Sequence, residues 1–270
     1  PKDTTDRNRT SPFAFTGNKF EFRMVGSSFS LAGPNIVINS AVADVLREFA
    51  DKLEAASDFN AELHDLVAET IKTHKRIIFN GNNYSDEWKK EAEKRGLLNL
   101  KNAAEALPHF ADEKNVALFE RTKVFTRREV VSRTEIMLEN YCKIMTIEAL
   151  TMSEMAKKDI YPAVNKYTGS LCKLVGAKKS VSEDICTEAE VSLVKELSAD
   201  NGSLYKKASE LDELLIEEKT FEDAAERAKF ISEKIIPVMN ELRAYSDGME
   251  MKVSSECWPF PTYGEILFSV

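Results

Sequence analysis

A short segment near the start of the chain carries residue types that could bind an anion and a cation together. It reads RNRTSPFAFTGNKFEFR, from Arg7 to Arg23, and it sets one carboxylate, Glu21, between two phenylalanines. If the stretch from Lys19 to Gly26 is a strand, Glu21 and Arg23 project from the same face, about 6.6 Å apart. Carboxylate oxygens suit Mg²⁺ or Mn²⁺, and the planar guanidinium group suits phosphate. The spacing fits a site for phosphate and metal, and it also fits a solvent-facing strand with alternating charges.

The charge of the chain is uneven along its length. The 270 residues include 37 lysines and arginines against 45 aspartates and glutamates, so the net charge is −8. Residues 1–25 reverse this balance, with five basic side chains against three acidic ones. An acidic total argues against a general binder of nucleic acid or anionic membranes. A local basic region on such a protein indicates a small anionic ligand.

Other features narrow the class of protein. The four cysteines are widely spaced without a paired CxxC motif, so neither a zinc site nor a dense disulfide framework is indicated, and we expect a reduced, cytoplasmic setting. No apolar run approaches the roughly 18 residues that span a bilayer, and the start of the chain lacks the pattern of a signal peptide. The chain begins without methionine, in what reads as structured sequence, which suggests a fragment.

Helical periodicity follows the basic segment. Apolar spacing predicts helices over residues 35–56, 60–79 and 86–94, the first of them preceded by Gly33-Pro34, and short helical pieces over residues 96–112.

Long amphipathic helices are expected in the second half of the chain. Thr126 and Glu129 fit a capping box, in which each residue bonds a free backbone N–H of the other. Three helices of this length cannot shield their apolar stripes alone, so the predicted fold is α+β and predominantly α, with a short β segment followed by an antiparallel bundle. Pro237 should kink the third helix, and the ending CWPFPTYGEILFSV should lie extended. The expected helices run over about 126–159, over 183–218, and onward from a cap at residues 220–223.

Several other reactive residue types are expected to have structural roles. His64, His74 and His109 share no ligand spacing, so ordinary surface or core positions are expected for them. Cys142 and the methionines on helical stripes should pack in the core. Lys178-Lys179 is expected to form a solvated turn.

The amino-acid sequences of several segments resemble those of a known protein family. Asn8-Arg9 followed by FEFR, from Phe20 to Arg23, resembles the C-terminal part of the glutamine synthetase catalytic domain. The runs FNGNNYSDEWKKEAEKRGL, SRTEIMLENYCKIMTIEALTM and WPFPTYGEILF resemble more narrowly the type III glutamine synthetases. The resemblance covers the whole chain. It implies that residues 1–112 are the C-terminal part of the catalytic domain, including a short piece of its sheet, and that residues 113–270 are a helical domain specific to type III.

The resemblance also implies an activity and roles for particular residues. In this family ATP drives the ligation of ammonia to glutamate through γ-glutamyl phosphate, with Mg²⁺ or Mn²⁺. Glu21 matches a metal-binding glutamate, Arg23 an arginine that contacts the phosphate and substrate region, and Arg9 the arginine that neutralises the phosphoryl group in transit. Lys19 is a weaker match, at a position near the nucleotide. Many members carry a second arginine where this chain has Ala14.

The resemblance implies that most of the family's active-site residues lie in segments that this chain does not contain. The remaining metal-binding carboxylates, the ammonia-site residues and the catalytic histidine come from earlier segments in the family, so the isolated chain is expected to be inactive. The full-length enzyme is expected to bind glutamate, ammonia and ATP as a homo-oligomeric dodecamer, without nucleic-acid or membrane partners. Two alternatives stay open: a ligase for another amine, and a non-enzymatic helical scaffold or oligomerisation module.

Overall fold

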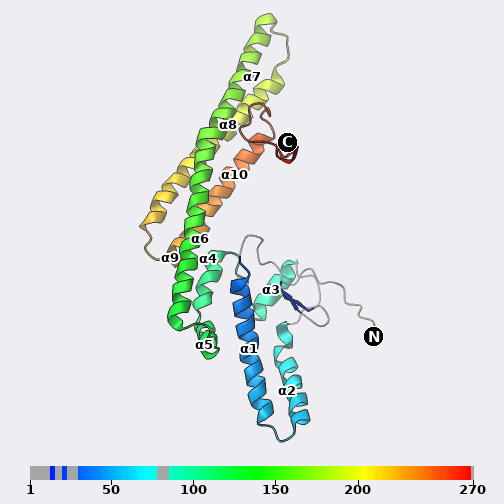
Figure 1. Cartoon of the computed structure of the whole chain (residues 1–270). Helices are drawn as coiled ribbons and strands as arrows, with labels where there is room; N and C mark the ends of the chain where they lie inside the picture. Colours follow the sequence, from blue (N-terminus) through cyan, green and yellow to red (C-terminus); the bar gives the residue numbers. More distant parts are fainter. Residues whose placement is uncertain (1–12, 16–19, 23–29, 78–84, 269–270) are drawn as a thin grey trace, which may run out of the picture. The chain divides into compact units, whose positions relative to one another are not determined.

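The computed structural model describes residues 13–15, 20–22, 30–77 and 85–268 of the chain. These residues belong to two compact units, and helices dominate both (Figure 1). Among the described helices, none combines the length and the hydropathy that crossing a membrane requires. The first unit comprises Pro1–Lys101 and Pro108–Arg133, and the second comprises Asn102–Leu107 and Thr134–Val270.

The first unit contains a short antiparallel hairpin. Strand β1 (Phe13–Phe15) pairs with β2 (Phe20–Phe22), and the register sets Ala14 opposite Glu21. β2 falls within the strand expected over residues 19–26, whose other residues lie outside the described part of the chain. That this hairpin belongs to a larger catalytic sheet stays a prediction.

Two helices follow in the same unit and overlap the predicted ones. The sequence placed Gly33-Pro34 ahead of the first helix, but the helix already includes both. Proline is tolerated there because the N–H groups of a first turn have no intrahelical partner. The second helix begins at an unmistakable cap, since the side chain of Asp58 accepts hydrogen bonds from the backbone N–H groups of Asn60 and Ala61. The elements are α1 (Ala32–Glu54), α2 (Phe59–His74) and the 3₁₀ turn η1 (Lys75–Ile77).

The core of the first unit forms around a short helix. Val116 and Phe119 are almost fully buried, and the rings of Phe110 and Phe125 lie 5.5 and 5.3 Å from that of Phe119. The helix α3 has the bounds that the sequence predicted, and short helical pieces follow it as expected. The elements are α3 (Asp86–Lys94), the 3₁₀ turn η2 (Leu107–Ala111) and α5 (Glu113–Arg121), and α4 (Ala103–Ala106), which lies between α3 and η2 in sequence, belongs to the second unit.

The predicted capping box at Thr126 is confirmed. The backbone N–H of Thr126 donates to Glu129 Oε2 at 2.8 Å, and the backbone N–H of Glu129 donates to Thr126 Oγ1 at 3.3 Å. Each residue thus satisfies a donor that the first turn of a helix leaves free. The helix that follows, α6 (Arg127–Met155), begins in the first unit and continues into the second after Arg133.

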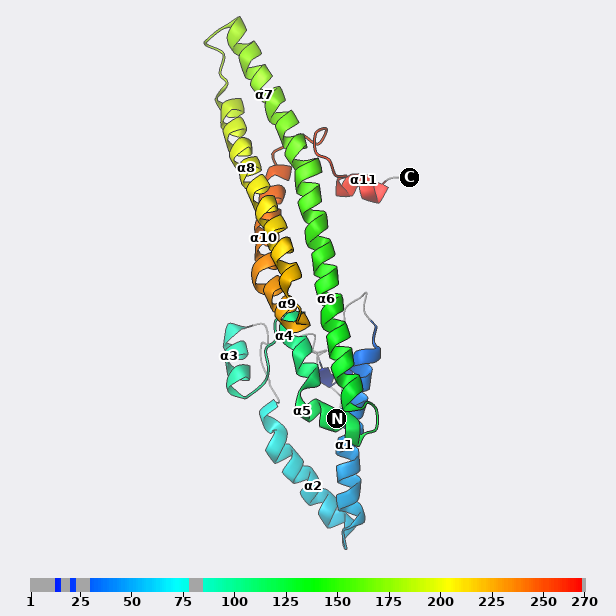
Figure 2. The same ribbon diagram turned by 90° about the vertical axis from the view of Figure 1, so that its left-hand side faces the viewer.

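Long helices that lie side by side build the second unit, as the apolar stripes predicted. Helix α7 packs against α8, and α8 packs against α10 (Figures 1 and 2). Because a short turn joins α7 to α8, the two run in opposite directions. After α6 the chain continues through the π-helical turn η3 (Ala156–Ile160), α7 (Tyr161–Val181), α8 (Glu188–Glu217), the 3₁₀ turn η4 (Glu218–Thr220), α9 (Ala224–Phe230), the π-helical turn η5 (Ile231–Ile235) and α10 (Ile236–Glu250).

Each π-helical turn lies directly before a proline. η3 ends two residues before Pro162, and η5 ends two residues before Pro237. Proline has no N–H to donate to the carbonyl four residues earlier, and its ring crowds that carbonyl. A turn that is one residue wider accommodates both effects without ending the helix. Sequence predicted a kink at Pro237, and the structure shows a π-helical turn before it; the corresponding turn before Pro162 was not predicted.

Helix α7 corrects the sequence analysis. No helix was predicted over residues 160–182, a stretch that contains Pro162, Gly169 and Gly176, residue types of low helix propensity. Packing against α8 outweighs that propensity. Lys178-Lys179 therefore lies in the last helical turn and not in a solvated loop, and Lys178 forms an ion pair with Glu190 of α8.

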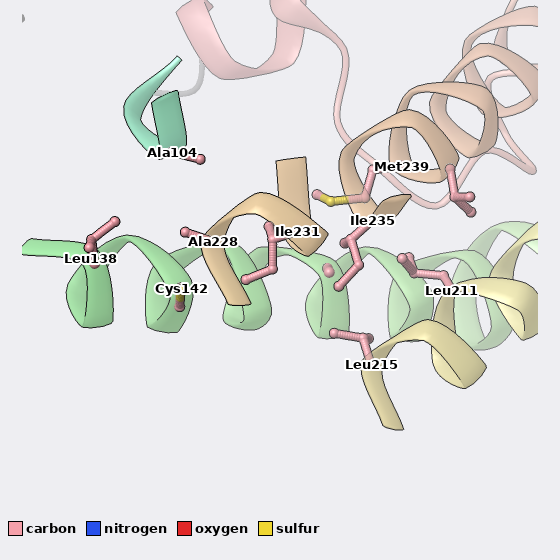
Figure 3. Packing of buried hydrophobic residues seen from close by; sticks show 11 residues of the cluster. Ala104, Leu138, Cys142, Leu211, Leu215, Ala228, Ile231, Ile235 and Met239 are labelled. Atoms are coloured by element: carbon pink, nitrogen blue, oxygen red, sulfur yellow. The ribbon is translucent and has the colours of Figure 1, made fainter. Parts of the chain in front are cut away.

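The interior of the second unit consists of apolar side chains from helices far apart in the sequence. Figure 3 shows Cys142 of α6 beside Ala228 of α9, and Leu211 and Leu215 of α8 beside Ile235. Cys142 is fully buried, as the sequence predicted.

The end of the chain also differs from the prediction of an extended tail. Thr262 and Glu265 form a second capping box, in which the Thr262 N–H donates to Glu265 Oε2 at 2.6 Å. The short helix α11 (Tyr263–Phe268) follows it. The spacing T-x-x-E was present in the sequence, but the two nearby prolines favoured an extended reading.

Candidate functional site

Of the residues proposed to bind metal and phosphate, the structure describes Glu21. Glu21 occupies the middle of β2, directly opposite Ala14 of β1. Arg9, Lys19 and Arg23 lie outside the described residues. The expectation that Glu21 and Arg23 share one face therefore stays a prediction.

A divalent cation needs several oxygen ligands, which a single glutamate cannot supply. In the described part of the chain, no three residues among histidine, cysteine, aspartate and glutamate come together as a metal site would require. His109 is paired instead with a neighbour, since its Nδ1 lies 2.9 Å from Asp112 Oδ2. The described residues therefore do not form a metal site by themselves.

A buried carboxylate in the first unit has a structural role. Asp44 lies on α1 and is only 6% exposed. Its Oδ2 accepts a 2.5 Å hydrogen bond from Arg121 Nη2 of α5, and its Oδ1 accepts one of 2.9 Å from Arg47. The hydrogen bond from Arg121 holds the pKa of Asp44 below its usual value. Because two guanidinium groups already bond this carboxylate, it fastens α1 to α5 and is not available to a ligand.

Sequence reasoning missed this ion pair. Arg121 lies 77 residues from Asp44, and nothing local marks one as the partner of the other. The sequence shows only that Asp44 lies within a predicted amphipathic helix, and nothing in it indicates that this aspartate is buried.

The second unit contains another buried carboxylate, Glu218, with an exposed fraction of 0%. Its Oε1 accepts hydrogen bonds from Arg227 Nε at 2.5 Å and from Thr146 Oγ1 at 2.9 Å. Cys142 lies on the same helix as Thr146, and burial raises the pKa of its thiol. A neutral, buried thiol is a poor nucleophile, so this cluster stabilises the bundle and offers no catalytic group.

A third polar cluster links α6 and the π-helical turn η3 to α8. Ser153 Oγ donates to Asp212 Oδ1 at 2.5 Å, and Lys157 forms an ion pair with the same carboxylate. Burial acts to raise the pKa of Asp212, but the hydrogen bonds from Lys157 and Ser153 outweigh it, so the pKa is lower than usual. All three polar groups thus have partners within their own units.

Comparison with known proteins decides the family. A family model described as "Glutamine synthetase C-terminal domain" matches residues 62–179. A glutamine synthetase of Butyrivibrio fibrisolvens is 39% identical over 274 residues, covering 100% of this chain and 39% of the relative. The type-3 glutamine synthetase of Dictyostelium discoideum is 37% identical over 278 residues, covering 99% of this chain and 37% of the relative. This chain belongs to the glutamine synthetase family.

Within the glutamine synthetase family, this chain is a C-terminal portion. A glutamine synthetase of Bacteroides fragilis (strain YCH46) shows the same relation, with 34% identity over 275 residues and 38% of the relative covered. The chain thus spans less than two fifths of the length of these relatives. The matched residues 62–179 include parts of both compact units.

Proposed function

We propose that the protein to which this chain belongs is a glutamate–ammonia ligase, which uses ATP to form γ-glutamyl phosphate and ammonia to release phosphate from it. The observation that supports this most directly is the similarity of essentially the whole chain to proteins named glutamine synthetase, at 34–39% identity. Glutamate, ammonia and ATP are the proposed substrates, and the cytoplasm is the proposed location.

The proposed roles of individual residues follow the family resemblance. Glu21 contributes one carboxylate ligand to a Mg²⁺ or Mn²⁺ ion, whose positive charge would offset the negative charge of the transferred phosphoryl group. Arg9 and Arg23 provide hydrogen-bond donors to that group, and Lys19 lies near the nucleotide. The register of the hairpin pairs Ala14 with the proposed metal ligand Glu21. The family resemblance implies an arginine in many members at the position of Ala14.

This chain contributes only a part of the proposed site. One glutamate cannot complete a metal site, so no step of the reaction is assigned to the metal here. The isolated 270-residue chain is proposed to be inactive. The complete enzyme is proposed to be a dodecamer, in which other segments supply the remaining ligands.

The test is the substrate dependence of ATP hydrolysis by the full-length protein. Release of ADP should require glutamate and ammonia together, with glutamine as the product, and the isolated chain should release none. Replacing ammonia with methylamine or ethanolamine tests the alternative amine ligase. ADP release that ignores ammonia but requires another amine would favour that alternative. The absence of any glutamate-dependent turnover in the full-length protein would favour a non-enzymatic scaffold.

A further inference from the structure

An open groove of about 480 Å³ lies in the second unit between α6 and α10. One wall consists of residues 147–155 of α6, and the other of residues 239–250 of α10. At 1.5 Å per residue, these walls are about 12 and 16 Å long. Trp258 and Phe260 also line it, with their ring centroids 6.3 Å apart. This length accommodates two to three turns of a helix.

The floor of the groove is apolar and firmly packed. Leu242 is 2% exposed, and Ile160 and Met239 are also buried. The α6 wall also carries apolar side chains, and these face solvent, since Ile147 is 53% and Met155 37% exposed. Flexible methionine side chains can adapt to different partners, a property common at surfaces that bind helices.

The rim of the groove is acidic. Glu148, Asp247 and Glu250 line it together with one cation, Arg243, which pairs with Asp247 at 3.2 Å. Glu148 and Glu250 are exposed, and no ion pair within the described residues engages either. Two uncompensated carboxylates therefore stand on opposite sides of an apolar floor, one on each helix.

We propose that this α6–α10 groove binds a basic amphipathic helix from a partner protein. The apolar face of that helix lies on Leu242, Met239 and the exposed wall at Ile147, and its lysines or arginines face Glu148 and Glu250. Charge complementarity of this kind selects the partner and its orientation.

The same charges argue against a second copy of α11 as the occupant. That helix exposes Leu267 and Phe268, so its hydrophobicity would suit the floor. Its sequence YGEILF contains Glu265 and no basic residue, and the whole chain carries a net charge of −8. Placing it between two free carboxylates would bring like charges together.

The experiment uses the full-length protein and a fluorescein-labelled, 18-residue synthetic helix of leucine and lysine with leucines on one face. A second peptide has glutamate in place of every lysine. Fluorescence anisotropy should show binding of the Leu/Lys peptide at least about tenfold tighter than that of the Leu/Glu peptide. The double substitution Glu148→Lys and Glu250→Lys should reverse this preference, and Ile147→Asn should weaken both peptides.

The matched control is the pair Glu213→Lys and Glu217→Lys, which changes net charge equally at exposed positions of α8 outside the groove. This variant should bind both peptides as the unmodified protein does. Equal losses in the control and the groove variant would mean nonspecific attraction to an acidic surface and would overturn the proposal. So would the failure of the Leu/Lys peptide to bind, as expected if another part of the full-length protein fills the groove. Glutamine synthesis is measured on every variant, and it should be unchanged.

Discussion

Two helices in the first unit end in the same hydrogen-bond pattern but with different residues at its critical position. After α3, the Leu97 N–H bonds Ala92 O at 2.9 Å and Gly96 has a φ of +82°. After α5, the Val124 N–H bonds Phe119 O at 3.0 Å and Lys123 has a φ of +55°. Both are Schellman motifs, whose left-handed residue is usually glycine. We predict that Lys123→Gly stabilises the first unit.

The expected gain is a difference of two backbone effects. A non-glycine residue in the left-handed region costs roughly 1–2 kcal/mol, which the substitution recovers. Glycine loses about 0.4–1 kcal/mol more conformational freedom on folding. The net stabilisation should be about 0.5–1 kcal/mol. The reverse change, Gly96→Ala, should destabilise by about the same amount, because no heavy atom lies within 4 Å of the added Cβ and the cost is the backbone conformation alone.

The assay is urea unfolding followed by tryptophan fluorescence. Trp88 lies in the same unit as Gly96 and Lys123, whereas Trp258 lies in the other. In the 270-residue chain, whose tryptophans are Trp88 and Trp258, a Trp258→Phe background leaves Trp88 as the fluorescent reporter of the first unit. The midpoint should rise for Lys123→Gly and fall for Gly96→Ala, with the slope unchanged. A lower midpoint for Lys123→Gly would refute the reasoning, since it would show that the lysine side chain contributes more than its conformation costs.

Three further predictions concern buried groups. Arg227→Met should destabilise the second unit by about 3 kcal/mol in urea unfolding because it leaves the Glu218 carboxylate buried without its cation, and adding Glu218→Leu should restore most of that loss; additive losses would contradict this. The hydrogen bond from Arg121 lowers the pKa of Asp44 from its usual 3.8. The Asp44–Arg121 pair therefore stabilises the folded protein fully above pH 3.8, and this stabilisation is lost as the pH falls through the lowered pKa of the folded state. Thermal melts should show this acid-dependent loss, and Asp44→Asn should reduce it. Iodoacetamide should label the two exposed cysteines of the native protein before Cys142, and mass mapping that finds all of them labelled equally fast would disprove the burial of that thiol.

Local sequence signals predicted the parts of this fold that depend on neighbouring residues. The capping box at Thr126 and Glu129 involves groups three residues apart, and the structure forms it as expected. The helix over 86–94 was predicted with its bounds, and the structure shows that the Ser85 side chain caps it by accepting from the Trp88 N–H. The stripes of the long helices were also readable, since each repeats every three or four residues.

Features that depend on distant packing were not readable. Asn201 is buried in α8, and its side-chain amide donates to Tyr161 O and Asn165 Oδ1 of α7, contacts that no local pattern indicates. Helix α7 itself was missed because its support comes from α8. The α6–α10 groove was likewise beyond prediction, since it combines residues about 90 positions apart.

The candidate site was predicted by a different route. Pattern alone left the segment around Glu21 open between a binding site and a surface strand, and only the family resemblance assigned roles. The structure adds the hairpin and its register, which brings position 14 opposite position 21. The remaining metal ligands could not be predicted because the family resemblance implies that they come from segments outside this chain.

The most direct test of the central proposal is calorimetric titration of Mn²⁺ into the full-length protein, comparing the unmodified enzyme with Glu21→Ala and with the exposed control Glu213→Ala. Loss of a direct ligand should lower the Mn²⁺ affinity at least about tenfold, since even second-shell changes cost that much, and ATP-dependent glutamine synthesis should fall with it while the control remains unchanged. Unaltered Mn²⁺ affinity and unaltered turnover in Glu21→Ala would contradict the assignment of this hairpin to the active site.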